Sequence, residues 1–140
     1  MIPTRRQLES YINKLKRPLL MELWEININI DEGEGAENGR LVLADVTVGE
    51  VSYQAHITFY WALFERSKRG QRQAIVHELL HCLLSQVNAP VTHDIFRTDL
   101  LPAPAKIVTE EALHREWELA TDHLAKVLAP FVPLPPWGDK

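Results

Sequence analysis

Apolar and polar residues alternate over three stretches in the first half of the chain. These stretches are residues 24–30, 40–48 and 51–60. A period of two is typical of strands that bury one face against a core, so each stretch predicts a β-strand. Gly49 and Glu50 form a short turn, and we therefore expect the second and third strands to pair as a tight hairpin. The acidic, glycine-rich segment 31–39 is expected to be a solvated loop.

A helical period appears in segments 4–17 and 71–86. In the first segment Thr4 can cap the start, and four apolar residues share one face. These are Leu8, Tyr11, Ile12 and Leu15. The second segment is apolar almost all round, which predicts a buried helix.

The last third of the chain predicts one more long helix, over residues 109–130, with Thr109 as its cap and Pro130 as its stop. Segment 87–108 contains three prolines, and we expect it to be irregular; loops of this length are usually functional. The proline-rich tail 131–140 is expected to pack on the body of the protein. The residues expected to anchor it are Phe131, Leu134 and Trp137.

These elements predict a single domain over residues 1–140, of the α+β class. We expect an N-terminal helix, a small three-stranded antiparallel sheet, a buried helix and a long C-terminal helix. A chain of 140 residues is long enough to bury a core without disulfides or metal.

Composition narrows the range of partners. The formal net charge is −4, and no basic cluster is present, so neither nucleic acid nor a membrane surface is an expected partner. The single cysteine, Cys82, excludes an intrachain disulfide and is expected to act as a small buried hydrophobe. The N-terminus lacks the apolar core of a signal peptide, so a cytoplasmic protein is expected. Oligomeric state is left open.

Residues 77–81 read His-Glu-Leu-Leu-His and form an HExxH motif inside the buried helix. Because side chains four residues apart share a helix face, the imidazoles of His77 and His81 can bind one metal ion. Glu78 lies about 100° round the helix, where a general base acting on a metal-activated water must sit. Two core histidines satisfied by hydrogen bonds are the alternative interpretation, but a buried polar stripe on an apolar helix favours a metal.

With this motif and this order of elements, the chain resembles the zincin metallopeptidases. More narrowly, it is similar to the small single-domain HExxH proteins encoded by bacteriophages and prophages. In those proteins a strand-rich half leads into a helix that begins near VVHELLH, and a later glutamate precedes a pattern ending in LAxxLAP. Here 118–130 reads ELATDHLAKVLAP, and the resemblance covers about residues 40–136. The extended metzincin motif is absent after His81.

The resemblance implies Zn²⁺ as the cofactor, with three protein ligands and an open position for water. The third ligand should come from the late helix, and Glu118 is the first choice because it fits the family pattern and borders the apolar stripe. Glu110 and Glu111 are the alternatives, since many zincins place this glutamate early in the helix. The other histidines are weaker candidates. His93 could be a ligand or stabilise an oxyanion. His114 and His123 could also coordinate the metal but are expected to be surface residues, and His56 is expected to be structural.

The function expected from these residues is zinc-dependent hydrolysis of a peptide bond in a peptide or protein substrate. That substrate is expected to add as a strand along residues 51–60. Tyr53 or Tyr60 could stabilise the oxyanion, but on a strand next to the core both are expected to be packing residues. The competing hypothesis is an inactive, zinc-stabilised binding or adaptor protein of phage origin, acting in a bacterial host. A different metal-dependent hydrolase is a third possibility. The substrate and its cleavage specificity stay undetermined by the sequence.

Overall fold

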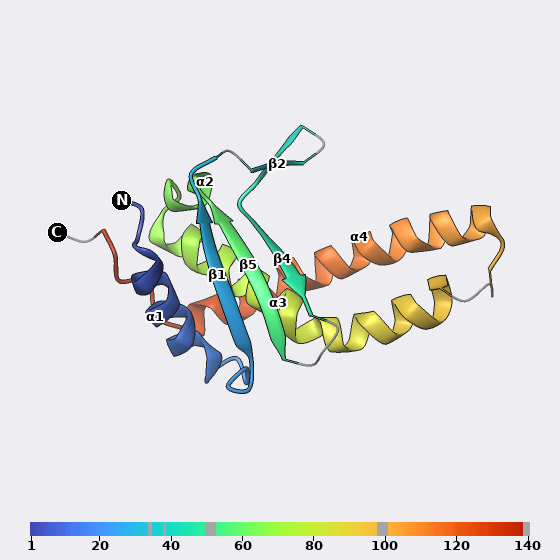
Figure 1. The fold of residues 1–140 in the computed structure, drawn as a ribbon, viewed down its shortest axis with the longest axis horizontal. Coiled ribbons are helices and arrows are strands. Elements are labelled where there is room, and N and C mark those ends of the chain that lie inside the picture. Colours follow the sequence, from blue (N-terminus) through green and yellow to red (C-terminus); the bar gives the residue numbers. More distant parts are fainter. Residues whose placement is uncertain (34, 38, 50–52, 98–100, 139–140) are drawn as a thin grey trace.

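The computed structural model describes residues 1–33, 35–37, 39–49, 53–97 and 101–138. Four α-helices and two small sheets make an α+β fold, and a long helix stands near the C-terminus, as expected (Figure 1). None of the helices formed by these residues has the length and apolar character needed to cross a membrane.

The main sheet has the strand order β1-β5-β4, where β1 is Glu25–Asp31, β4 is Ala44–Val48 and β5 is Gln54–Tyr60. β4 and β5 pair antiparallel, in agreement with the expected hairpin; Glu50 of its expected turn lies outside the described residues, and so do residues 51 and 52 of the expected strand. β1 pairs with β5 in parallel, so the prediction of a wholly antiparallel sheet is wrong. Alternation fixes which side chains face the core but not which strand is the neighbour, nor its direction.

A second, two-stranded sheet stands apart from the first. β2 (Gly35–Glu37) lies inside the segment expected to be a loop, and it pairs antiparallel with β3 (Arg40–Val42). The predicted strand 40–48 is therefore divided at Leu43 between two sheets. Gly35 lets this β2–β3 hairpin pack closely on the main sheet, because a Cβ at this position would lie 2.5 Å from Cδ2 of Tyr60.

α1 (Arg5–Lys16) begins with a capping box between Thr4 and Gln7, as the first helical segment predicts. After the short helix α2 (Trp61–Phe64), α3 (Lys68–Thr92) begins at Ser67, whose side chain accepts a hydrogen bond from the backbone N–H of Gly70. The buried side chains of α3 confirm that the motif helix lies in the core. They are Gln71, Ile75, Val76, Leu79, Leu80 and Cys82.

The region after the motif helix differs from expectation. α3 continues through Pro90 to Thr92, the π-helical segment η1 (His93–Arg97) follows, and α4 (Ala103–Leu128) already begins at Ala103. The predictions of an irregular 87–108 and of a cap at Thr109 are therefore wrong. α3 and α4 pack against each other, and this tertiary support outweighs the local effect of the prolines. Pro104 lies in the first turn of α4, where proline is well tolerated.

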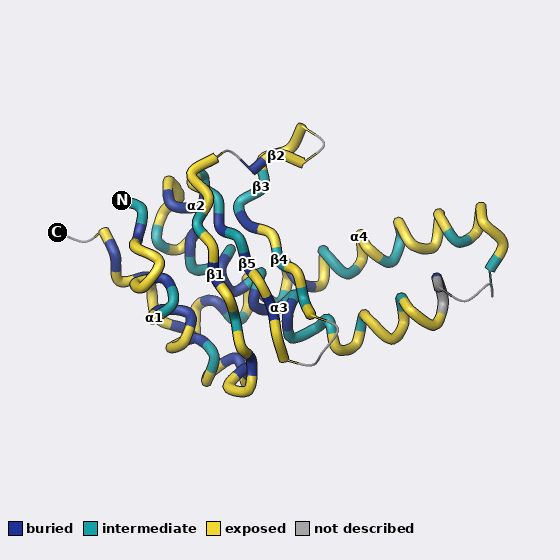
Figure 2. Tube along the Cα trace, viewed as in Figure 1, coloured by how far each residue is buried: buried dark blue, intermediate teal, exposed yellow. Residues whose placement is uncertain are grey.

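α3 covers one face of the main sheet, α1 packs beside β1, and α4 runs along α3 (Figure 1). Figure 2 shows burial concentrated in this body, whereas the ends of α3 and α4 that project beyond the sheet are mostly exposed. The tail after η2 (Ala129–Phe131) is anchored by Trp137, which is 3 % exposed and donates a hydrogen bond to Gln71. Phe131 is 82 % exposed, so its expected packing on the body is wrong.

Candidate metal centre

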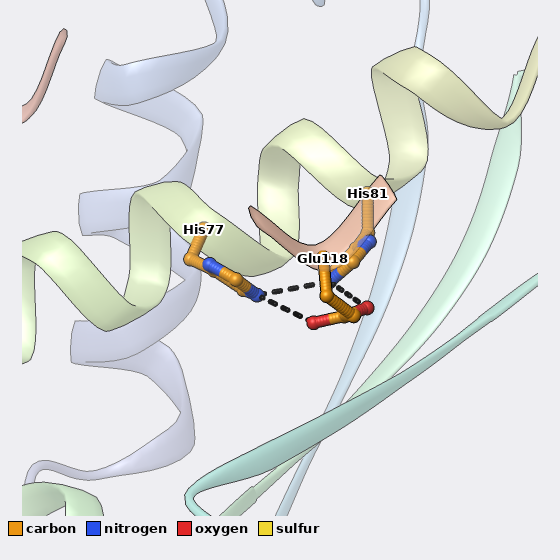
Figure 3. A group of neighbouring side chains, drawn as sticks. All are labelled: His77, His81 and Glu118. Carbon is orange, nitrogen blue, oxygen red and sulfur yellow. Dashed lines mark hydrogen bonds and ion pairs between the residues drawn. The ribbon is translucent and has the colours of Figure 1, made fainter. Parts of the chain in front are cut away.

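The two histidines of the HExxH motif project from the same face of α3 (Figure 3). They lie one helical turn apart, and their rings meet nearly edge to face, with centroids 4.6 Å apart. The Nε2 atoms of His77 and His81 are 2.9 Å from each other. Both side chains are largely buried, with 19 % and 15 % of their surfaces exposed. The helix therefore directs two nitrogen donors to one point.

Glu118 reaches the same point from the middle of α4 (Figure 3). Its Oε1 lies 3.2 Å from Nε2 of His81, and its Oε2 lies 3.6 Å from Nε2 of His77. The three ligand-type atoms lie within 4.8 Å of one another. The structure thus brings together the three residues that were first choice as metal ligands.

This donor set fits a zinc ion. Two imidazole nitrogens and one carboxylate are a common catalytic zinc triad, and donors bound at about 2.1 Å in tetrahedral geometry stand about 3.4 Å apart. The two imidazole nitrogens are 2.9 Å apart, and each lies 3.2 or 3.6 Å from the carboxylate oxygen of Glu118 that faces it, so the spacing is close to that value. Three donors also leave one tetrahedral position for a water or a substrate atom.

Carboxylates in and around the cluster favour a positive charge at this point. The adjacent imidazoles of His77 and His81 hold the pKa of Glu118 well below its usual range, so this carboxylate stays ionised. Burial lowers the pKa of His77, but Glu118 and the charges of Glu78 and Asp122 outweigh burial, and its net pKa is raised. A cation at this point is therefore stabilised by its surroundings.

Glu78 lies beside the cluster and lines the same cleft. Burial raises the pKa of Glu78 to about 7, although the nearby His77 and His81 oppose that shift. Among the described residues none forms a hydrogen bond or ion pair with its carboxylate. A carboxylate that is partly desolvated and unpaired beside a metal site is suited to accept and donate a proton.

The cluster borders a cleft of ≈ 820 Å³. Residues of α3, of α4 and of the β2–β3 hairpin line it. A space of this size accommodates several residues of a peptide. The site is thus open to a ligand on the side away from the core.

The alternative third ligands do not reach the cluster. Glu111 and Glu110 precede Glu118 by seven and eight residues on α4, or about 10 to 12 Å along the helix axis. Both are exposed, and Glu110 borders a separate small hollow of ≈ 160 Å³ near Phe96. Their expected position in the first turn of the helix is wrong, because α4 begins at Ala103.

The remaining candidates also lie elsewhere. His93 is exposed in η1 and contacts Asp94, and His56 and His123 are exposed. The Tyr60 hydroxyl donates a hydrogen bond to Asp45, and the ring of Tyr53 packs edge-on against Trp24. Neither tyrosine lines the cleft.

Two further side chains of α4 line the cleft, and sequence reasoning did not assign them to the site. His114 and Asp122 stand four residues before and after Glu118, on the same helix face. That spacing was visible in the sequence and could have identified both. Asp122 contributes to the raised pKa of His77 and also forms an ion pair with Lys126.

Cys82 is fully buried behind the motif, and burial raises the pKa of its thiol to about 12, which confirms its role as a hydrophobic residue.

The chain matches no protein-family model, no curated protein and no solved structure. The function is therefore inferred from the sequence motif and from the geometry of the cluster.

Proposed function

We propose that this protein is a zincin-like, zinc-dependent peptidase. The observation that carries the proposal is the convergence of His77, His81 and Glu118 on one point, where His77 and Glu118 line an open cleft. Glu78 lines the same cleft, and its carboxylate has no hydrogen-bond or ion-pair partner among the described residues. His77, His81 and Glu118 would hold Zn²⁺, which when bound supplies Lewis acidity toward a water and a carbonyl oxygen. The HExxH motif and the resemblance to phage-encoded metallopeptidases support the same function.

Glu78 is the general base and acid of the proposed reaction. Its carboxylate takes a proton from the attacking water and returns it to the leaving amine nitrogen. Its partly buried position keeps bulk water from competing for that proton. A binding protein does not require a carboxylate here, so Glu78 favours an enzyme over the alternative of an inactive zinc-stabilised adaptor.

The substrate's path follows from the sheet. β5 (Gln54–Tyr60) is the central strand, so the expected strand addition along it is excluded, and β4 is the edge beside α3. The N–H of Tyr60 donates to the carbonyl of Leu43, and the N–H of Gly49 donates to the carbonyl of Gln54. The backbone groups of Leu43 and Gly49 therefore point toward β5. Since antiparallel pairs alternate, the backbone groups of Val46 and its neighbours two residues away point outward. An extended peptide can add to β4 there.

Zinc content tests the metal site first. Mass spectrometry of the purified protein is expected to find one zinc per chain, and little or none in the variants His81→Ala and Glu118→Ala. Glu111→Ala is the matched control and should keep its zinc. A folded wild-type protein that neither contains nor takes up zinc would exclude the proposed site.

Turnover tests the enzyme. The zinc-loaded protein is expected to cleave members of a mixed peptide library, and Glu78→Gln should keep zinc but lower the rate at least about a hundredfold. Zinc bound with no cleavage of any peptide or unfolded protein would favour the adaptor hypothesis. Loss of zinc from Glu78→Gln would contradict the role assigned to Glu78.

A further inference from the structure

A second, smaller hollow lies between the projecting parts of α3 and α4, where the two helices run side by side beyond the sheet (Figure 1). Its volume is ≈ 160 Å³. The side chains that line it come from α3, η1 and α4, and they are Asn88, Thr92, Phe96, Glu110, Leu113 and His114. Pockets that enclose a whole small molecule have about 300 Å³ or more, so this hollow has room for a single side chain.

His114 connects this hollow with the metal site, because it lines both the hollow and the cleft. On α4, His114 stands one turn before Glu118, and Glu110 stands two turns before Glu118. At 1.5 Å of rise per residue, these separations are about 6 and 12 Å along the helix axis. An extended peptide advances about 3.3 Å per residue, so a substrate bound at the metal can place a side chain in the hollow within about three residues of the scissile bond.

Apolar surface and oxygen acceptors share this hollow. Phe96 is 6 % exposed and Leu113 is partly buried, and both contribute apolar surface. The Thr92 hydroxyl donates a 3.3 Å hydrogen bond to Oδ1 of Asn88, and both oxygens can still accept another. The carboxylate of Glu110 forms no hydrogen bond or ion pair within the described part of the chain.

The charge at this hollow is negative. Among the described residues that line it, Glu110 is the only carboxylate, and no lysine or arginine accompanies it. Lys106 stands one turn before Glu110 on α4, but it does not line the hollow and does not pair with that carboxylate. A cation is therefore the occupant whose charge complements the hollow, and the net charge of −4 on the chain also favours a basic peptide.

Building on the proposed peptidase function, we propose that this hollow is a subsite for a lysine or arginine side chain of the substrate, with Glu110 as its specificity-determining residue. The methylene stem of that side chain packs on Phe96 and Leu113, and its cationic group reaches the exposed carboxylate of Glu110. An acidic substrate residue is disfavoured here because it would face the same carboxylate. The α-ammonium group of a substrate N-terminus carries the same charge but has no stem to fill the apolar part.

Cleavage-site profiling tests this subsite. Two mixed peptide libraries, one with acetylated and one with free N-termini, are incubated with the zinc-loaded protein, and the products are sequenced by mass spectrometry. Lysine and arginine are expected to be enriched roughly twofold to fivefold at one position within about three residues of the cut, in both libraries. A preference seen only for the free N-terminus, or an enrichment of apolar residues instead, would overturn the assignment.

Charge variants show whether Glu110 causes the preference. Glu110→Gln should remove most of the enrichment, and Glu110→Lys should replace it with an enrichment of acidic residues. Glu111→Gln is the matched control, since Glu111 is the exposed neighbour and does not line the hollow. High salt should reduce the preference in the wild type. Cleavage without basic enrichment, or enrichment kept in Glu110→Gln, would overturn the subsite and leave the peptidase intact.

A binding measurement separates the two proposals. Glu78→Gln protein supplied with zinc is immobilised, and the acetylated library is passed over it. Retention of lysine- and arginine-containing peptides that is lost on adding Glu110→Gln but kept on adding Glu111→Gln, without any cleavage by the wild type, would support the subsite and reject the peptidase. Neither cleavage nor selective retention would reject both.

Discussion

At the scale of single residues, the site shows why a residue's position in the fold matters more than its chemical type. The chain contains six histidines and nineteen acidic residues, but only His77, His81 and Glu118 meet among the described residues. His93 and His123 have the same chemistry and stand in solvent. What distinguishes the three is their position on two helices that pack against each other, which fixes the donors at one point.

Tyr11 provides a residue-scale prediction away from the site. Its hydroxyl donates a 2.7 Å hydrogen bond to the Pro133 carbonyl, and its ring packs edge-on against Trp137. Burial raises its pKa far above the usual range, although Arg72 opposes the shift. The fold therefore favours the neutral phenol, and the associated stability is present below about pH 10, the pKa in the unfolded chain, and is lost as pH rises further.

Tyr11→Phe tests this linkage. The variant should lose about 1 kcal/mol of unfolding free energy at neutral pH, because the Pro133 carbonyl loses its donor. Above about pH 10 its stability should fall less steeply than that of the wild type, since the group that must ionise is gone. Urea unfolding at several pH values measures both effects. Parallel curves for the two proteins would mean that Tyr11 does not cause the alkaline loss.

At the scale of elements, local pattern predicted the type of most segments but not their neighbours. α1, β1, the β4–β5 pair and the motif helix agree with expectation because each carries a strong period or cap. The parallel pairing of β1 with β5 and the early start of α4 depend on contacts between distant segments. The prolines in 87–108 disfavour a helix locally, but the packing of α3 on α4 stabilises helix there.

The free edge of β4 gives an element-scale prediction. Val46→Pro removes an N–H that points away from β5, so the sheet should stay intact and the thermal midpoint should change little. The N–H of Thr47 faces β5, so the control Thr47→Pro should cost about 1 to 3 kcal/mol of stability. If a substrate strand adds to β4, Val46→Pro should cut the rate of library cleavage roughly tenfold. Unchanged cleavage in a folded Val46→Pro protein would argue for another path.

At the scale of the whole molecule, the metal cluster joins the two halves of the fold. His77 and His81 belong to the helix that covers the sheet, and Glu118 belongs to the helix packed behind it. Because the unfolded chain holds no such cluster, zinc binding should stabilise the native state. Zinc at the proposed site would therefore add to the stability of the fold as well as supply the proposed chemistry.

The predicted consequence is a zinc-dependent melting temperature. Free zinc at a hundred times its Kd contributes about 2.7 kcal/mol, which for a domain of this size raises Tm by about 10 °C. Differential scanning calorimetry with zinc and with a chelator measures the shift. Glu118→Ala should show a smaller shift and Glu111→Ala an unchanged one. An equal Tm with zinc and with chelator would contradict a structural link between α3 and α4 through the metal.

The sequence by itself determined which groups the candidate site offers: an HExxH motif on a buried helix, with a glutamate beside two imidazole donors, in an α+β chain with a late helix. These features are local, because a helix places residues four apart on one face whatever surrounds it. Only the tertiary structure decided that Glu118 and not Glu111 meets the histidines, that β4 is the edge beside them, and that Glu110 borders a hollow next to their cleft. These depend on how separate elements pack, and no local period encodes the distance between two helices or the order of strands in a sheet.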